Sequence, residues 1–244
     1  MSGHSKWANI KHKKEKTDSQ RARMFSKIGR EIMVAVREGG ADPEGNNRLK
    51  DIIAKAKSVN IPNENISRSI KKAAGDAGAA NFEVIWYEGY GPEGVAFMIK
   101  AMTDNRNRTA GDVRHIIDKF GGNLGATGCV SYLFEEKGQI LIENIGGVDE
   151  DKLMMDALDL GADDFKPWDE YFEIITQPAD FSKVREGLEK KGHSFISAGV
   201  EMIPLTTAKV ADPKHVEMME KMIDSLEDLE DVQNIYNNLE QDIE

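Results

Sequence analysis

The residues best suited to chemistry in this chain are cations gathered near its amino-terminal end. The same stretch holds an aromatic ring and an imidazole, and its candidate contact residues are Lys6, Trp7, Lys11, His12, Lys13 and Lys14. Lysine side chains neutralise phosphates and release counterions, and an indole ring stacks on an unpaired base. So concentrated a basic stretch predicts an arm that binds a polyanion, although two ordinary surfaces of opposite charge would also account for it.

A second set of cations follows on an amphipathic helix that we expect over residues 17–38. At 100° per residue its apolar side chains fall on one arc, namely Phe25, Ile28, Ile32, Ala35 and Val36. The basic candidates on the opposite arc are Arg23, Lys27, Arg30 and Arg37, with Arg21 near the start of the helix. Like charges spaced at helical intervals repel each other, and an anionic partner would relieve that repulsion. The pattern favours a nucleic-acid-binding face over a solvated basic one.

A loop rich in amide and guanidinium groups lies where an expected strand meets the start of an expected helix. Its candidate residues are Asn105, Arg106, Asn107 and Arg108. Donors gathered at a helix amino terminus suit a phosphate group. The alternative is a self-capping loop in which both arginines pair with neighbouring acids, and the sequence leaves the two interpretations evenly balanced.

Residue patterns for catalysis, metal binding or nucleotide binding are not found. The five histidines show no metal-ligand spacing, no G-x-S-x-G occurs, and no pair of carboxylates is singled out. Cys129 lies in an expected strand, where a buried and inert thiol is typical. The glycines at 122, 125 and 128 match no phosphate-loop pattern and favour a helix cap and tight turns. We therefore predict that the protein is not an enzyme and has no cofactor, metal or small-molecule substrate.

Charge is divided unevenly along the 244 residues. The chain has 32 Lys and Arg against 43 Asp and Glu, a net charge of −11. Residues 1–75 hold 17 basic and 8 acidic side chains, hence +9, so residues 76–244 carry −20. Such asymmetry is typical of a chain with one nucleic-acid-facing end. The single cysteine excludes an internal disulfide, and the longest apolar run, residues 95–99, is too short to span a membrane. We expect a cytoplasmic protein.

The expected elements indicate an α+β fold. Helices over 17–38, 46–60 and 62–75 predict an N-terminal three-helix domain that, with the basic arm, occupies residues 1–75. Strands over 82–88, 94–103 and 129–135 and a helix over 109–120 begin an α/β domain. A possible strand at 206–210, a helix at 212–228 and a strand at 231–237 would complete it, which makes the domain discontinuous, 82–135 and 205–244. The helix at 212–228 is expected to bury Met219 and Met222 in the core.

The intervening residues 136–204 predict an inserted α/β domain. Their expected order is strand 138–143, helix 149–160, strands 163–167 and 171–176, helix 180–191 and strand 194–203. This β-α-β-β-α-β order is that of the ferredoxin-like split unit. We thus predict two α/β domains of ferredoxin-like character, one inserted in the other.

Four segments resemble the YebC/PmpR family along essentially the whole chain. They are GHSKWANIKHKK (3–14), YEGYGPEGVA (87–96), TDNRNRT (103–109) and GGNLGATGCVSYLF (121–134). The resemblance implies a helical N-terminal domain, two α/β domains and a cytosolic, non-enzymatic regulator of gene expression. Some members are regarded as DNA-binding transcription factors; others are tied to the ribosome and assist synthesis of difficult sequences such as proline runs. Two departures, Glu93 where glycine is usual and Ala126 to Cys129 in place of E-T-G-S, remove no basic residue.

Charge, candidate residues and resemblance together favour a regulator of gene expression that binds nucleic acid. We expect it to bind DNA and to regulate transcription. The alternative is a factor bound to ribosomal RNA or to the ribosome that relieves stalling, because a long duplex would be repelled by the acidic remainder of the chain. A metal-dependent nuclease is a minor alternative that rests only on the abundance of carboxylates. An adaptor whose acidic part docks on basic proteins is compatible with the first reading.

Overall fold

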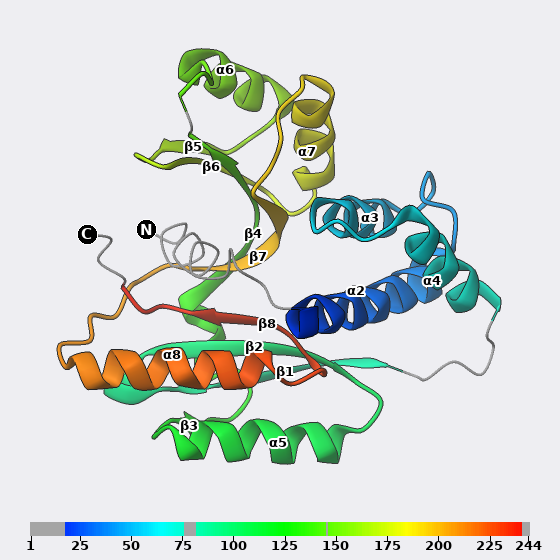
Figure 1. Cartoon of the computed structure of the whole chain (residues 1–244). Helices are drawn as coiled ribbons and strands as arrows, with labels where there is room; N and C mark the ends of the chain where they lie inside the picture. Colours follow the sequence, from blue (N-terminus) through cyan, green and yellow to red (C-terminus); the bar gives the residue numbers. More distant parts are fainter. Residues whose placement is uncertain (1–17, 76–81, 145, 241–244) are drawn as a thin grey trace. The chain divides into compact units, whose positions relative to one another are not determined.

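The computed structural model describes residues 18–75, 82–144 and 146–240, with backbone only for residues 18–21. The fold is mixed α+β, as expected. Helices come first along the chain, and two sheets with antiparallel strand pairs follow them (Figure 1). The chain divides into two compact units, which we describe one at a time: Met1–Val34 with Asp76–Glu135 and Ile203–Glu244, and Ala35–Gly75 with Glu136–Met202. None of the helices in the described part is long and apolar enough to cross a membrane. The division into domains 1–75, 82–135 with 205–244, and 136–204 stays a prediction.

Three helices precede the first sheet. They are α2 (Asp18–Gly39), α3 (Asn47–Ser58) and α4 (Asn63–Gly75), each within a few residues of the expected range. Asn46 links α2 to α3: its Oδ1 accepts from Leu49 N at 3.0 Å, and its Nδ2 donates to Ala35 O at 2.8 Å and to Gly40 O at 2.9 Å. One buried amide thus caps the start of α3 and hydrogen-bonds to backbone carbonyl groups at the end of α2.

The sheet of the first unit has the strand order β3-β1-β2-β8. Its strands are β1 (Glu83–Tyr90), β2 (Ala96–Thr103), β3 (Asn123–Leu124) and β8 (Val232–Asn237). Helices α5 (Arg106–Lys119) and α8 (Pro213–Glu227) share one core with Phe97 and Ile99 of β2, so both cover the same face (Figure 1). Met219 and Met222 are fully buried there, which confirms their expected place in the core.

The sheet of the second unit has the order β5-β6-β4-β7. Its strands are β4 (Phe134–Glu143), β5 (Asp164–Pro167), β6 (Tyr171–Thr176) and β7 (Ser197–Pro204), and its helices are α6 (Glu150–Leu160) and α7 (Phe181–Lys190). Chain order and strand order together are those of a ferredoxin-like unit. In the same unit Arg185 of α7, with a side chain 4% exposed, pairs with Asp51 of α3 at 2.9 Å, and Lys50 pairs with Glu186 at 3.1 Å.

Three expectations about local structure are wrong. Residues 129–135 are not a separate strand: a 3-10 turn occupies Ser131–Leu133, and β4 runs unbroken from Phe134 to Glu143. Residues 206–210 form no strand, only a single parallel bridge between Ala208 and Leu239. Helix α5 begins at Arg106 rather than Thr109, because Asn105 is its N-cap and accepts from Arg108 N at 3.1 Å.

Candidate nucleic-acid interface

The predicted contact residues of the basic arm lie outside the described part of the chain. This applies to Lys6, Trp7, Lys11, His12, Lys13 and Lys14, whose role stays a prediction. Arg21 belongs to α2, but only its backbone is described.

The basic face of α2 is occupied by acceptors from the chain's own carboxyl-terminal part. Arg23 forms an ion pair with Asp228. Lys27 donates from Nζ to the carbonyl oxygen of Glu227 at 2.8 Å. Arg30 bonds Asp231 at 2.9 Å and Glu230 at 3.0 Å, and its side chain is only 14% exposed. In the described part of the chain these three side chains therefore have internal acceptors, and their contact with an external anion stays a prediction. Periodicity gave the correct arc but not the partners some 200 residues away.

Asp231 is the centre of a buried polar network. Its Oδ1 accepts from Arg30, and its Oδ2 accepts from Arg108 at 2.8 Å and from Thr109 Oγ1 at 2.7 Å. Thr103 Oγ1 lies 3.2 Å from the same oxygen. Burial alone would raise the pKa of Asp231, but the hydrogen bonds from Arg108 and Thr109 and the charge of Arg30 hold it below its ordinary value. Reciprocally, the hydrogen bonds and charges of Asp231 and Asp104 raise the pKa of Arg108 further above its ordinary value.

The loop at residues 105–108 takes the self-capping form. Asn105 caps α5, Arg106 pairs with Glu83 at 2.9 Å, and Arg108 pairs with Asp104 at 2.9 Å as well as with Asp231. Asn107 is exposed. The structure thus brings three of the four candidates into internal contacts rather than into a phosphate site.

A cavity of about 320 Å³ opens beside the Asp231 network. Two arginines line it against four carboxylates, together with one threonine and two apolar side chains; the lining residues are Arg30, Phe82, Asp104, Arg108, Thr109, Asp112, Leu229, Glu230 and Asp231. The excess of carboxylates makes this cavity a poor receptor for a phosphate. Among the described residues, no group of three or more histidine, cysteine, aspartate or glutamate side chains is placed to hold a metal ion.

The glycine-rich segment before β4 holds an internal anion. The carboxylate of Glu88, 4% exposed, accepts from Gly128 N at 2.8 Å, Val130 N at 3.0 Å and Ser131 N at 2.9 Å. Burial alone would raise the pKa of Glu88, and these backbone donors lower it below its ordinary value. The turn therefore wraps a side chain of its own chain, as the expectation of tight turns implies.

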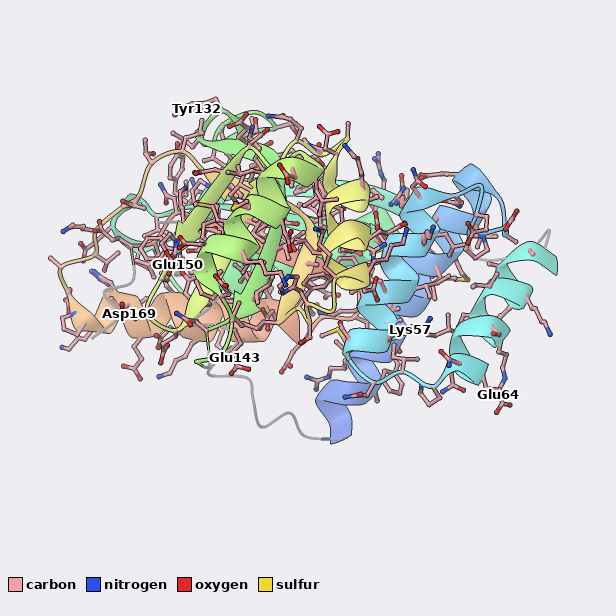
Figure 2. The ribbon with its side chains drawn as sticks, turned by 90° about the horizontal axis from the view of Figure 1, so that it is seen from above. Lys57, Glu64, Tyr132, Glu143, Glu150 and Asp169 are labelled. Atoms are coloured by element: carbon pink, nitrogen blue, oxygen red, sulfur yellow. The ribbon has the colours of Figure 1, made fainter. Side chains whose placement is uncertain are left out.

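In the described part of the chain, α3 and α4 carry cations that face solvent without an ion-pair partner. Arg68, Lys71 and Lys72 have the spacing i, i+3, i+4 on α4, opposite the side of Ile66. Within the described ranges, Lys71, Lys72 and the exposed Lys57 have no ion-pair partner, and Arg68 makes only an exposed pair with Glu64. Figure 2 labels Lys57 near the end of α3 and Glu64 near the start of α4. We call Arg68, Lys71 and Lys72 the α4 ridge.

Sequence reasoning passed over the α4 ridge because the first helix carried more basic residues. The signal was present: residues 47–75 hold seven basic side chains against two acidic ones, Asp51 and Glu64. Arg37, the remaining candidate, is exposed in the last turn of α2 and makes an interaction within the structure.

Comparison with known proteins gives consistent matches over nearly the whole chain. Residues 5–76 match the model of the TACO1/YebC protein N-terminal domain, and residues 82–239 match that of the TACO1/YebC second and third domain. A protein of Acetivibrio thermocellus named "Probable transcriptional regulatory protein" is 67% identical over 238 residues, 98% of each chain. One of Ruminiclostridium cellulolyticum with the same name is 60% identical and covers 100% of this chain and 98% of its own. The crystal structure of a conserved hypothetical protein from Aquifex aeolicus, 48% identical, superposes with a TM-score of 0.86 over 96% of both chains.

Proposed function

This chain belongs to the TACO1/YebC family, and from that premise we propose that it is a non-enzymatic regulator of gene expression that binds nucleic acid. The membership indicated by the four sequence segments is confirmed. The names of its relatives support a regulatory role in transcription. The proposal adds the contact with nucleic acid and the residues that make it.

The observation that carries the proposal is the α4 ridge. Lys71 and Lys72 lie exposed and without a counterion among the described residues, on the same helix side as Arg68. The pair between Arg68 and Glu64 leaves both side chains more than two-thirds exposed, so a phosphate displaces the carboxylate at little cost. Three cations at this spacing track a phosphate backbone without reading bases.

We propose the arm residues Lys6, Lys11, Lys13 and Lys14 as a second set of contacts, argued separately from the α4 ridge. Trp7 supplies a stacking surface and His12 a further donor. Arg30 and Arg108 are not part of this set because the buried carboxylate of Asp231 already holds them. Backbone contacts of this kind give affinity with little sequence specificity.

Two kinds of nucleic acid are candidates. The names of the relatives favour a role in transcription, for which DNA is the target. The charge of −20 on residues 76–244 favours a compact target such as ribosomal RNA, since so large a negative charge repels a long duplex. Crosslinking in cells, followed by sequencing of both DNA and RNA, separates them: enrichment at promoters supports the transcriptional role and enrichment on ribosomal RNA supports the translational one.

The contact itself is tested by the salt dependence of binding. Fluorescence anisotropy of the full chain with labelled duplex DNA and with a structured RNA gives the slope of log K against log salt concentration. Six to eight phosphate contacts predict a slope of about −5 to −7 on duplex DNA. Replacing Lys71 and Lys72 with alanine should reduce its size by about 2.

A matched control is the double variant K152A/K183A. It removes the same charge from two exposed lysines of α6 and α7 and should leave the slope unchanged. A flat salt response of the full chain would refute nucleic-acid binding. An equal loss in both double variants would refute the assignment to the α4 ridge.

A further inference from the structure

Helix α6 is apolar on two sides. Its inner side packs Leu153 and Ala157, both fully buried, into the core of the ferredoxin-like unit. Its outer side exposes three large apolar side chains, Met154 at 36%, Met155 at 61% and Leu158 at 47%. A surface helix normally presents polar residues on the side away from the core, so this second apolar side is one that a partner would cover.

The three exposed side chains form one continuous stripe. Met154 and Leu158 are separated by four positions and Met155 and Leu158 by three, which places them as neighbours along the helix surface. Asp151 occupies the same side one turn earlier, so the positions 151, 154, 155 and 158 follow the i, i+3, i+4, i+7 spacing of a helix-packing face. Methionine side chains adapt to varied apolar partners, and this suits a docking surface.

Carboxylates surround the stripe. Residues 149–164 contain seven acidic side chains and a single lysine, Lys152. Glu150, Asp151 and Asp159 are exposed and have no ion-pair partner in the part of the chain that the structure describes; Figure 2 labels Glu150 at the start of the helix. This arrangement repels nucleic acid and anionic membranes. It also repels the same stripe on a second copy of the chain.

We propose that the outer face of α6, defined by Met154, Met155 and Leu158 within its acidic rim, docks a basic amphipathic helix of a partner protein. Apolar side chains of the partner cover the stripe, and its lysines and arginines meet Glu150, Asp151 and Asp159. This inference is independent of the proposed contact with nucleic acid, since it uses a different surface and the opposite charge.

The test uses the full chain labelled with ¹³C at methionine methyl groups and a synthetic helical peptide of leucine and lysine, with leucines at i, i+3, i+4 and i+7. A scrambled peptide of the same composition controls for charge alone. We expect the patterned peptide to shift the methyl signals of Met154 and Met155 and to leave those of the buried Met219 and Met222 in place. The scrambled peptide should bind at least about tenfold more weakly.

Two variants separate the apolar contact from charge. M155E/L158E adds negative charge, so a weakening of at least about tenfold despite it would show that the stripe itself is covered. V200E carries the same kind of change at an exposed apolar residue of β7, 38% exposed, and should bind like the unaltered chain. Unshifted Met154 and Met155 signals, or equal loss in V200E, would overturn the proposal.

Other occupants are distinguishable in the same samples. If M155E/L158E changes the sedimentation coefficient of the chain alone, a second copy covers the stripe. If removal of residues 1–16 shifts the Met154 and Met155 signals without any peptide, the chain's own arm covers it. Either result would overturn the assignment to a partner protein.

Discussion

Replacing Asp231 with asparagine should destabilise the protein through loss of one buried charge. The Asp231 side chain is 10% exposed and accepts hydrogen bonds from Arg30, Arg108 and Thr109. Asparagine keeps the shape but removes the charge, and its amide cannot accept from all of these donors. Arg30, 14% exposed, would keep the exposed Glu230 as its acidic partner among the described residues.

Breaking a buried ion pair from one side costs about 3–5 kcal/mol, and the remaining acid beside Arg30 reduces that figure to about 2–3 kcal/mol. For a chain of this length the loss corresponds to a fall in Tm of roughly 5–10 °C, measured by circular dichroism. The control is D228N, which removes the partner of Arg23 in a pair exposed by 38% and 62% and should cost about 0.5 kcal/mol. A fall in Tm no larger for D231N than for D228N would refute the reasoning.

The pH dependence provides a second check on the same residue. Because the pKa of Asp231 is lowered in the folded protein, its contribution to stability is complete above the ordinary aspartate pKa of about 4. That contribution is lost as the pH falls through the lowered value. The difference in Tm between the unaltered protein and D231N should therefore shrink on acidification, and a constant difference would contradict the charge-based explanation.

Three further substitutions should change the stability of the protein, and one of them should also change the reactivity of its cysteine. E88Q should cost about 1–3 kcal/mol, read from denaturant unfolding, because the amide leaves backbone N–H donors without an acceptor. G138A should cost about 1–3 kcal/mol by the same measurement, since a Cβ there meets Thr176 Oγ1. G29A, with nothing within 4 Å of its Cβ, should instead stabilise α2 by about 0.5–1 kcal/mol. Burial and the charge of Glu88 raise the pKa of Cys129, so iodoacetamide should alkylate this thiol faster in E88Q than in the unaltered chain.

Elements governed by local periodicity were predictable from the sequence. The spacing of Ile66 and Ile70 predicted a helix over 62–75, and α4 spans Asn63–Gly75. The order of the expected elements in 136–204 was enough to predict the ferredoxin-like unit, because only a few sheet topologies accommodate β-α-β-β-α-β.

Elements governed by distant polar groups were not predictable. The apolar run at 129–135 looks like a strand, but Glu88 draws the amides of Val130 and Ser131 into a turn from more than 40 positions away. Thr109 looks like a helix start, but its hydroxyl bonds Asp231, 122 positions away, and Asn105 caps the helix instead. A single sequence contains no signal for either pairing.

The same limit explains why the candidate site moved from α2 to the α4 ridge. Charge counting gives +9 for residues 1–75, but the segment from Glu227 to Asp231 supplies acceptors for Arg23, Lys27 and Arg30. An incoming polyanion can compete for Arg23, whose pair with Asp228 is exposed, far more easily than for Arg30, whose partner is buried and fixed by other donors. Lys71 and Lys72 need no such displacement. The cations of α2 are therefore graded in availability from Arg23 down to Arg30, and position on a helical arc alone does not reveal that order.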